Sequence, residues 1–117
     1  MSLRARMRAA LPEAMRARDR VAVKALRTAL AALDNAEAVP MPESRGGAIE
    51  HSPVGVGAAE VARRELSETS IAEIVRAEAT ERLETAATLT GTAHAERAEQ
   101  LRAEAAVLLR LLDEPPA

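Results

Sequence analysis

The side chains of this chain that are best suited to chemistry are basic, and they gather near its amino end. Residues 1–30 hold eight Lys or Arg against two Asp or Glu, whereas residues 31–117 hold eight against sixteen, so the formal net charge of −2 divides into +6 and −8. Clustered guanidinium and ammonium groups can bind nucleic-acid phosphates, with an affinity that falls as salt is added. The candidate nucleic-acid-binding residues are Arg4, Arg8, Arg16, Arg20, Lys24 and Arg27.

Two other interpretations of this basic stretch stay open. The chain contains no Phe, Tyr or Trp, so it offers no aromatic ring on which a base could stack. The cations could form a solvated helix face, or they could pair with the acidic second helical hairpin across the bundle or across a dimer interface. Charge alone therefore leaves nucleic-acid binding, solvation and self-pairing as alternatives.

No set of residues has the spacing of a catalytic or metal site. The chain has no Cys, and its only histidines, His51 and His94, have no second ligand at metal-binding spacing. The serines lack a neighbouring base that would activate a nucleophile. Glu78 and Arg82 have the i,i+4 spacing of a helical ion pair, which we expect on a solvated face. We expect no catalytic residue, no metal, no cofactor and no catalytic activity of the chain's own.

Apolar residues recur at helical spacing in four stretches, which predicts an all-α fold. The expected helices cover about residues 2–18, 19–37, 68–90 and 93–112. Short connections pair the first helix with the second and the third with the fourth. The predicted architecture is a four-helix bundle of two antiparallel helical hairpins, which form a single domain over residues 1–113.

Local signals mark where these helices begin and where one is interrupted. Ser2 and Asp19 are expected N-caps of the first two helices, and either Ser67 or Ser70 caps the third. Pro12 lies inside the first helix, where proline removes a backbone hydrogen bond, so we expect a kink near residues 9–11 or two short helices. Gly91 is the expected turn residue of the second hairpin.

A long linker is predicted between the hairpins. Residues 38–66 hold four of the five glycines and three of the six prolines, and no apolar period survives there. This composition is typical of a flexible Pro/Gly-rich connection, with Val61 and Leu66 docking its end on the bundle. Residues 114–117, which include two prolines, are predicted to form a disordered tail.

The predicted core is aliphatic and thin. The 28 alanines favour helix but bury little area each, so dimerisation could add to the core. No apolar run approaches the length of a membrane span and no signal core is evident, so we expect a cytoplasmic protein with no membrane partner. The candidate core residues are Leu3, Met7, Leu11, Met15, Val23, Leu26, Leu30, Leu33, Ile71, Ile74, Val75, Leu83, Leu101, Leu108 and Leu112.

Parts of the sequence resemble the GatB/YqeY family. In the first half the likeness lies in Ala-Met-Arg-Ala-Arg-Asp at residues 14–19 and in Asn-Ala-Glu at residues 35–37. In the second half it lies in Leu-Ser-Glu at residues 66–68 and in the isoleucines that follow. The match covers about residues 1–37 and 66–112, without the family's usual second helical subdomain, so it corresponds to a truncated form.

The resemblance implies an all-helical, YqeY-like module without catalytic residues. The family is similar to the tail of the B subunit of the glutamyl/aspartyl-tRNA amidotransferase, which helps to hold tRNA while the chemistry occurs elsewhere. It implies a module that interacts with tRNA or another RNA, or that is accessory to glutamine-dependent tRNA amidation; the family label is carbon–nitrogen ligase activity with glutamine as amido-N-donor. The alternative is a protein–protein interaction or homodimerisation module with no nucleic-acid ligand.

Overall fold

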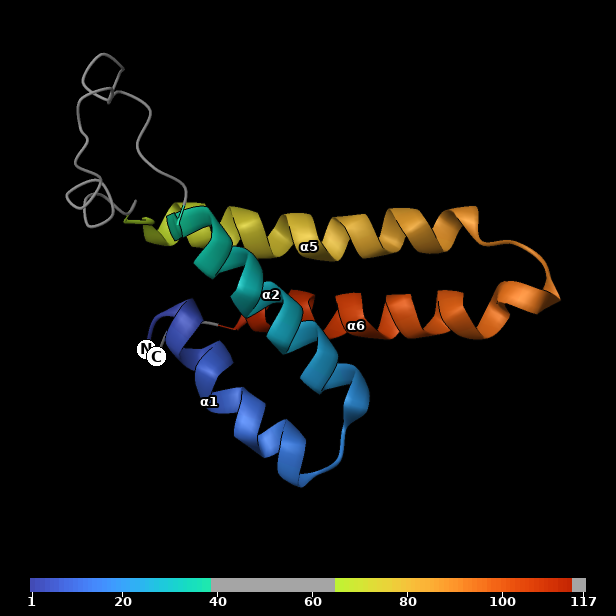
Figure 1. Ribbon diagram of the computed structural model, residues 1–117, viewed down its shortest axis with the longest axis horizontal. Helices are drawn as coiled ribbons and strands as arrows, with labels where there is room; N and C mark the ends of the chain where they lie inside the picture. Colours follow the sequence, from blue (N-terminus) through green and yellow to red (C-terminus); the bar gives the residue numbers. More distant parts are fainter. Residues whose placement is uncertain (39–64, 115–117) are drawn as a thin grey trace, which may run out of the picture.

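The computed structural model describes residues 1–38 and 65–114, and every regular element in these two ranges is a helix (Figure 1). The all-α class predicted from the sequence is therefore confirmed for this part of the chain. Helix bounds lie close to the expected ones, with a short 3-10 turn before the last helix. The elements are α1 (Leu3–Arg16), α2 (Arg20–Ala38), α5 (Glu68–Thr88), η2 (Thr92–His94) and α6 (Ala95–Asp113).

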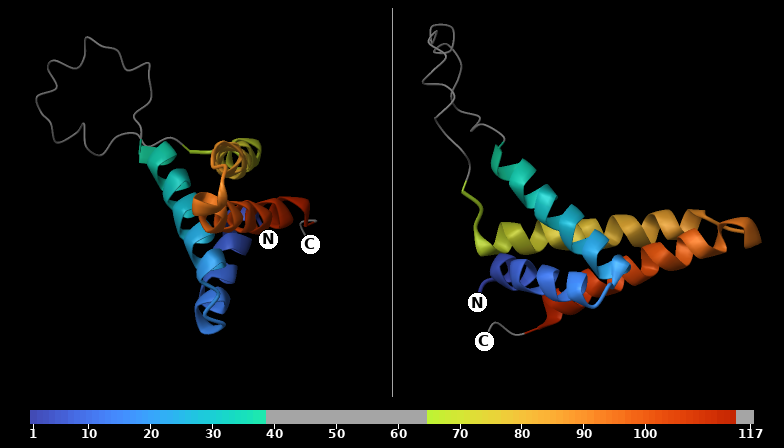
Figure 2. Two further views of the ribbon diagram at one scale, coloured as in Figure 1. Left: turned by 90° about the vertical axis from the view of Figure 1, so that its right-hand side faces the viewer. Right: turned by 60° about the horizontal axis from the view of Figure 1, so that its bottom comes forward.

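The helices form two antiparallel hairpins that cross each other. Helices α1 and α2 make one hairpin and α5 and α6 the other, and α2 lies obliquely across both α5 and α6 (Figures 1 and 2). The far end of the α5–α6 hairpin, at the η2 turn, extends beyond α1 and α2 (Figure 1). The two hairpins therefore share one contact region, and the outer part of the second hairpin is covered only by its own two helices.

Three side chains fix where the helices begin. The Ser2 hydroxyl accepts a hydrogen bond from the Ala5 amide at 3.1 Å, and the Asp19 carboxylate accepts one from the Ala22 amide at 3.0 Å. Ser67, not Ser70, caps α5, because its hydroxyl accepts from the Ser70 amide at 3.0 Å. Each cap satisfies an amide that the first helical turn leaves without a backbone partner.

Helix α1 runs without interruption through Pro12, so the expectation of two short helices is wrong. Proline removes only its own amide donor, and Pro12 is solvent-exposed, where its ring meets no other helix. Met7 on one side of it and Ala14 on the other are both buried against the rest of the fold. Both halves of this one helix are therefore packed against the rest of the fold.

Alanines form the centre of the main core. Ala25 and Ala29 of α2, Ala79 of α5 and Ala105 of α6 are fully buried where the two hairpins meet. A methyl side chain lets helix backbones approach more closely than leucine would allow. Leucines and other larger side chains surround this crossing; those that are fully or almost fully buried are Met7, Leu26, Leu33, Val75 and Leu108.

Two of the predicted core residues are exposed instead. Met15 is 49% exposed and Leu83 is 41% exposed, whereas the other candidates are buried or half-buried. The buried stripe of α5 passes through residues 71, 75, 79, 82 and 86, so Leu83 lies just outside it and Arg82 takes the inward position. Met15 belongs to the last turn of α1, next to the turn that leads into α2.

Much of the predicted linker lies outside the described residues, as do Val61 and residues 115–117. At its edges, Ala38 is still part of α2, and Leu66 is half-buried against the main core. Glu114, the first residue of the predicted tail, accepts a hydrogen bond from Arg6 at 3.2 Å. None of the described helices combines the length and the hydropathy needed to cross a membrane.

Candidate nucleic-acid interface

A groove of about 580 Å³ lies on one face of α2, where the α1–α2 turn meets its first turns. The α2 residues that line it lie at positions 20, 23–24 and 27–28, one helical turn apart, so they share one helix face. Four of its seven lining residues are cations. We call this surface the basic groove; it is lined by Met15, Arg18, Arg20, Val23, Lys24, Arg27 and Thr28.

The turn that closes one end of the basic groove has the Schellman geometry. The Asp19 amide donates to the Ala14 carbonyl at 2.9 Å and the Arg18 amide donates to the Met15 carbonyl at 3.1 Å. Arg18 adopts φ 58°, the left-handed conformation that this motif usually gives to glycine. The chain therefore holds an arginine in a backbone conformation that costs an L-residue about 1–2 kcal/mol.

Part of the lining of the basic groove is apolar. Met15 is half-exposed there, Val23 is partly buried, and an Arg27 guanidinium nitrogen lies 3.9 Å from the Met15 sulfur. Arg18, Arg20, Lys24 and Arg27 line the same groove, and none of the four makes an ion pair with another residue of the described ranges. The groove therefore combines two apolar side chains with four cations.

The structure divides the six predicted binding residues into two groups. Arg20, Lys24 and Arg27 line the basic groove, whereas Arg4, Arg8 and Arg16 do not. Arg4 pairs with Glu37 at 3.0 Å and only 18% of its side chain is exposed, so this pairing is internal but lies within the first hairpin and does not involve the acidic second one. Two arginines of the basic stretch were not among the predicted six, Arg18 and Arg6.

The remaining arginines of α1 have separate surroundings. Arg16 forms an i,i+3 pair with Glu13 at 3.2 Å on the exposed surface, and Arg8 is exposed. Arg6 donates to the Leu111 carbonyl at 2.8 Å, which ties the start of α1 to the end of α6. A smaller hollow of about 310 Å³ beside Arg6 also contains Glu68 and Glu114, so it has no excess of positive charge.

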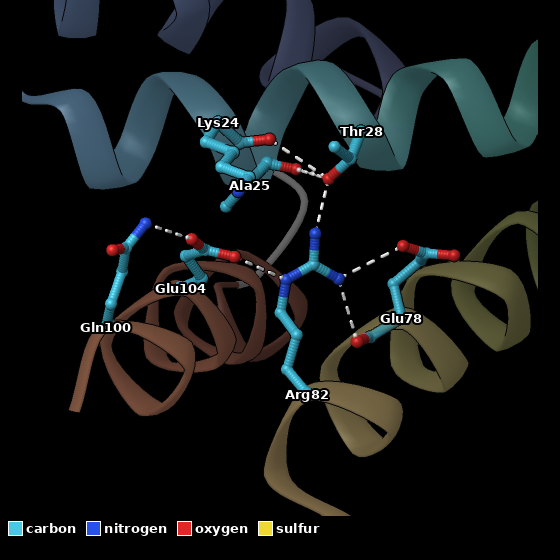
Figure 3. A network of polar contacts seen from close by, with 7 residues as sticks. All are labelled: Lys24, Ala25, Thr28, Glu78, Arg82, Gln100 and Glu104. Atoms are coloured by element: carbon cyan, nitrogen blue, oxygen red, sulfur yellow. Dashed lines mark hydrogen bonds and ion pairs between the residues drawn. The ribbon is translucent and has the colours of Figure 1, made fainter. Parts of the chain in front are cut away.

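A buried polar network lies directly behind the basic groove, where α2 crosses α5 and α6 (Figure 3). The Arg82 Nε donates to Glu104 Oε1 at 2.9 Å, and one Arg82 Nη donates to the carboxylate and carbonyl of Glu78 at 3.0 and 2.9 Å. The second Nη donates to the Thr28 hydroxyl, and Gln100 donates to the other Glu104 oxygen at 3.0 Å. Glu104 is 1% exposed, and all three guanidinium nitrogens of Arg82 are bonded.

The expectation of a solvated Glu78–Arg82 face is therefore wrong: the pair exists, but only 10% of the Arg82 side chain is exposed. Reasoning from the sequence also missed Glu104. A signal was present, because Arg82 and Glu104 each occupy a position at helical spacing inside an otherwise apolar stripe, and their charges are opposite. Two opposite charges at inward positions of facing helices indicate a buried ion pair.

Thr28 connects the network to the groove. Its hydroxyl accepts from Arg82 and donates to the carbonyls of Lys24 at 3.0 Å and Ala25 at 3.2 Å, while Thr28 itself lines the groove. The Arg82 guanidinium thus holds the α2 turn that carries Lys24 against the second hairpin. The position of that groove cation depends on a contact in the core.

Nothing in this arrangement resembles a reaction centre. Within residues 1–38 and 65–114 no three His, Asp or Glu side chains gather as metal ligands would. Glu104 is buried, but its two oxygens are occupied by Arg82 and Gln100 and it lines neither hollow.

Comparison with protein-family models, with curated proteins and with solved structures gives no match.

Proposed function

We propose that this chain is a non-catalytic helical module that binds RNA, with tRNA as the first candidate, through the basic groove. The observation that carries the proposal is the convergence of Arg18, Arg20, Lys24 and Arg27 on one concave surface. None of the four pairs with a carboxylate of residues 1–38 or 65–114, so no ion pair in these ranges weakens their attraction for an external anion. Arginine also binds phosphate oxygens through two parallel hydrogen bonds, which gives such a contact a defined geometry.

Two further points support RNA as the anion. The hairpin that carries the groove, residues 1–38, holds eight Lys or Arg against four Asp or Glu, so its side chains carry a formal net charge of +4. The likeness of residues 1–37 and 66–112 to the GatB/YqeY family makes tRNA the RNA to test first. An accessory part in glutamine-dependent tRNA amidation is the finer form of this proposal, and it rests on that likeness alone.

Filter binding of bulk tRNA at several salt concentrations tests the proposal. We expect log affinity to fall linearly with log salt, with a slope that grows by about 0.7–0.9 for each phosphate contact. Arg27→Gln should weaken binding and reduce the slope by about one such step. Arg76→Gln, an exposed arginine of α5 outside the groove, is the matched control and should leave the slope unchanged. No binding at low salt, or an affinity indifferent to salt, would overturn the proposal.

A second candidate function is protein–protein interaction, including homodimerisation. The observation in its favour is the outer part of the α5–α6 hairpin, where Ala86, Ala98 and Leu101 form a small core apart from the main one. Leu83, on the same hairpin, is 41% exposed. Light scattering across a concentration series tests this alternative, because a strict monomer at every concentration removes homodimerisation.

A further inference from the structure

We infer that the basic groove accommodates an unpaired nucleobase, held on Met15 and Val23 beside phosphates that the lining cations bind. The inference rests on the proposed function and specifies which form of RNA the groove recognises. It follows from a property that charge alone does not explain, namely that two apolar side chains line the groove together with the cations, and that one of them is open to solvent. Met15 is 49% exposed there, although it is one of only four methionines in the chain.

The cations are spread along the groove, beside the two apolar residues. Arg18 is in the α1–α2 turn and Arg20 in the first turn of α2, whereas Lys24 and Arg27 lie one and two turns further along the helix. Arg20 and Arg27 are separated by seven residues, which corresponds to about 10 Å along the helix axis. A strand whose phosphates meet cations along this span would lie in the groove that Met15 and Val23 also line.

Double-stranded RNA would leave the apolar side chains of the groove unused. In a duplex the bases are stacked inside and the phosphates are outermost, so a duplex could contact only the cations. An unpaired nucleotide can turn its base outward, and every base offers a flat π-face to a protein surface. The apolar part of the lining therefore favours single-stranded segments, loops or ends over helical stems.

The groove can contact such a base even though the chain has no aromatic residue. A methionine thioether makes favourable contacts with aromatic rings, and its flexible side chain adapts to different bases. A guanidinium group stacks on flat ring systems, and the Arg27 guanidinium already lies 3.9 Å from the Met15 sulfur. Met15 and Arg27 thus form a contact surface with one apolar and one cationic part.

The experiment compares four fluorescently labelled probes by anisotropy at one low salt concentration, using the full chain. The probes are a short single-stranded polyadenylate, an abasic oligonucleotide of the same length and backbone charge, an RNA duplex of the same length, and polyglutamate of matched charge. We expect polyadenylate to bind on the order of tenfold more tightly than the abasic strand, the size of effect that one stacked base provides.

Variants assign the effect to the groove. Met15→Ala should weaken polyadenylate binding by about two- to tenfold and leave abasic binding unchanged, because it removes a base contact and no charge. Arg20→Gln should weaken both strands alike. Leu83→Ala removes an equally exposed apolar side chain from the other hairpin and is the matched control, expected to change neither. Far-UV circular dichroism shows whether each variant is folded.

The outcomes separate this inference from the proposed function. Equal affinity for polyadenylate and abasic strands, or a Met15→Ala variant that weakens both equally, would overturn the nucleobase contact while RNA binding stands. Tighter binding of the duplex than of polyadenylate would overturn it as well. If no nucleic acid binds, the proposed function fails with it. If polyglutamate binds as tightly as polyadenylate, the groove suits an acidic protein segment and the nucleobase inference is wrong.

Discussion

Arg82 of α5 and Glu104 of α6 face each other at 2.9 Å, from Nε to Oε1, inside the apolar stripe of each helix. They are placed where α2 crosses the second hairpin, and Arg82 reaches Thr28 of α2 from the same position (Figure 3). Three helices are therefore joined through one guanidinium group. Such a buried charge is stable only while all of its partners are in place, which makes the network sensitive to the loss of one.

Replacing Glu104 alone should be strongly destabilising. Glu104→Ala leaves the mostly buried Arg82 without its closest carboxylate, and loss of one partner of a buried pair costs about 3–5 kcal/mol. The double variant Arg82→Met/Glu104→Leu removes both charges and fills the space with apolar groups, so we expect its free energy of unfolding to lie within about 1 kcal/mol of the parent or above it. Urea denaturation followed by far-UV circular dichroism measures both.

The comparison of single and double variants tests the interpretation even if Glu104→Ala does not fold. Recovery of a cooperative transition in the double variant would show that the uncompensated arginine caused the defect. A Glu104→Ala protein with the urea midpoint of the parent would show that the ion pair contributes nothing. A double variant as unstable as the single one would show that the apolar pair does not replace the ion pair, against the expectation.

A bulkier residue at the crossing of the hairpins should also be destabilising. Ala29 is fully buried against the second hairpin, and Ala29→Leu inserts a branched side chain where the helices meet through methyl groups. Overpacking of this kind typically costs about 1–3 kcal/mol. Ala31→Leu makes the same change on the exposed side of the same helix and should alter stability by less than about 0.5 kcal/mol. Similar urea midpoints for the two variants would contradict close packing at the crossing.

Replacing Arg18 with glycine should raise the stability of the fold and weaken RNA binding. Because its φ is 58°, Arg18→Gly should raise the free energy of unfolding by about 0.5–1 kcal/mol, after the extra entropy of glycine in the unfolded state offsets part of the gain. The same change removes a cation from the basic groove and should weaken tRNA binding. Thermal denaturation and filter binding on one preparation give both quantities. A variant that is less stable than the parent would argue against strain at this residue.

Arg4 and Arg16 should differ in what they do for stability. Arg4 and Glu37 are 18% and 23% exposed and join α1 to the end of α2, so Arg4→Gln should cost about 1 kcal/mol. The Arg16–Glu13 pair is more than 70% exposed on both sides, and Arg16→Gln should change stability by no more than a few tenths of a kcal/mol. Chemical denaturation decides the order, and a larger loss for Arg16→Gln would reverse the assignment.

The sequence predicts the helices well because their signals are local. The expected N-caps are present: Ser2, Asp19 and, of the two candidate serines, Ser67. Apolar spacing also predicts the inward faces of α2 and α6. The way in which the hairpins meet is not a local property. The closest contact is made by alanines, which occur at 28 positions in the chain, and nothing in their spacing distinguishes those at the crossing.

The candidate site was predictable only in part for a similar reason. Arg20, Lys24 and Arg27 follow from helical spacing, because they lie on one face of one element. Arg18 belongs to a turn, where spacing does not predict direction, and its positive φ follows from the backbone bonds of the Schellman motif. Helical spacing alone also failed to tell Arg82 from Leu83. Arg82, and not Leu83, points inward in α5, because its guanidinium bonds to Glu104 on the facing helix.

The outer end of the α5–α6 hairpin is a suitable place to attach a dye or a surface tether. Gly91 turns there with φ 89°, and no atom lies within 4 Å of where a side chain would begin. Since the chain has no Cys, a Thr90→Cys variant would carry the only thiol, on an exposed residue of that turn. A dye or surface tether placed there would stand well away from α1 and α2, so occupancy of the groove could be followed without touching it (Figure 1).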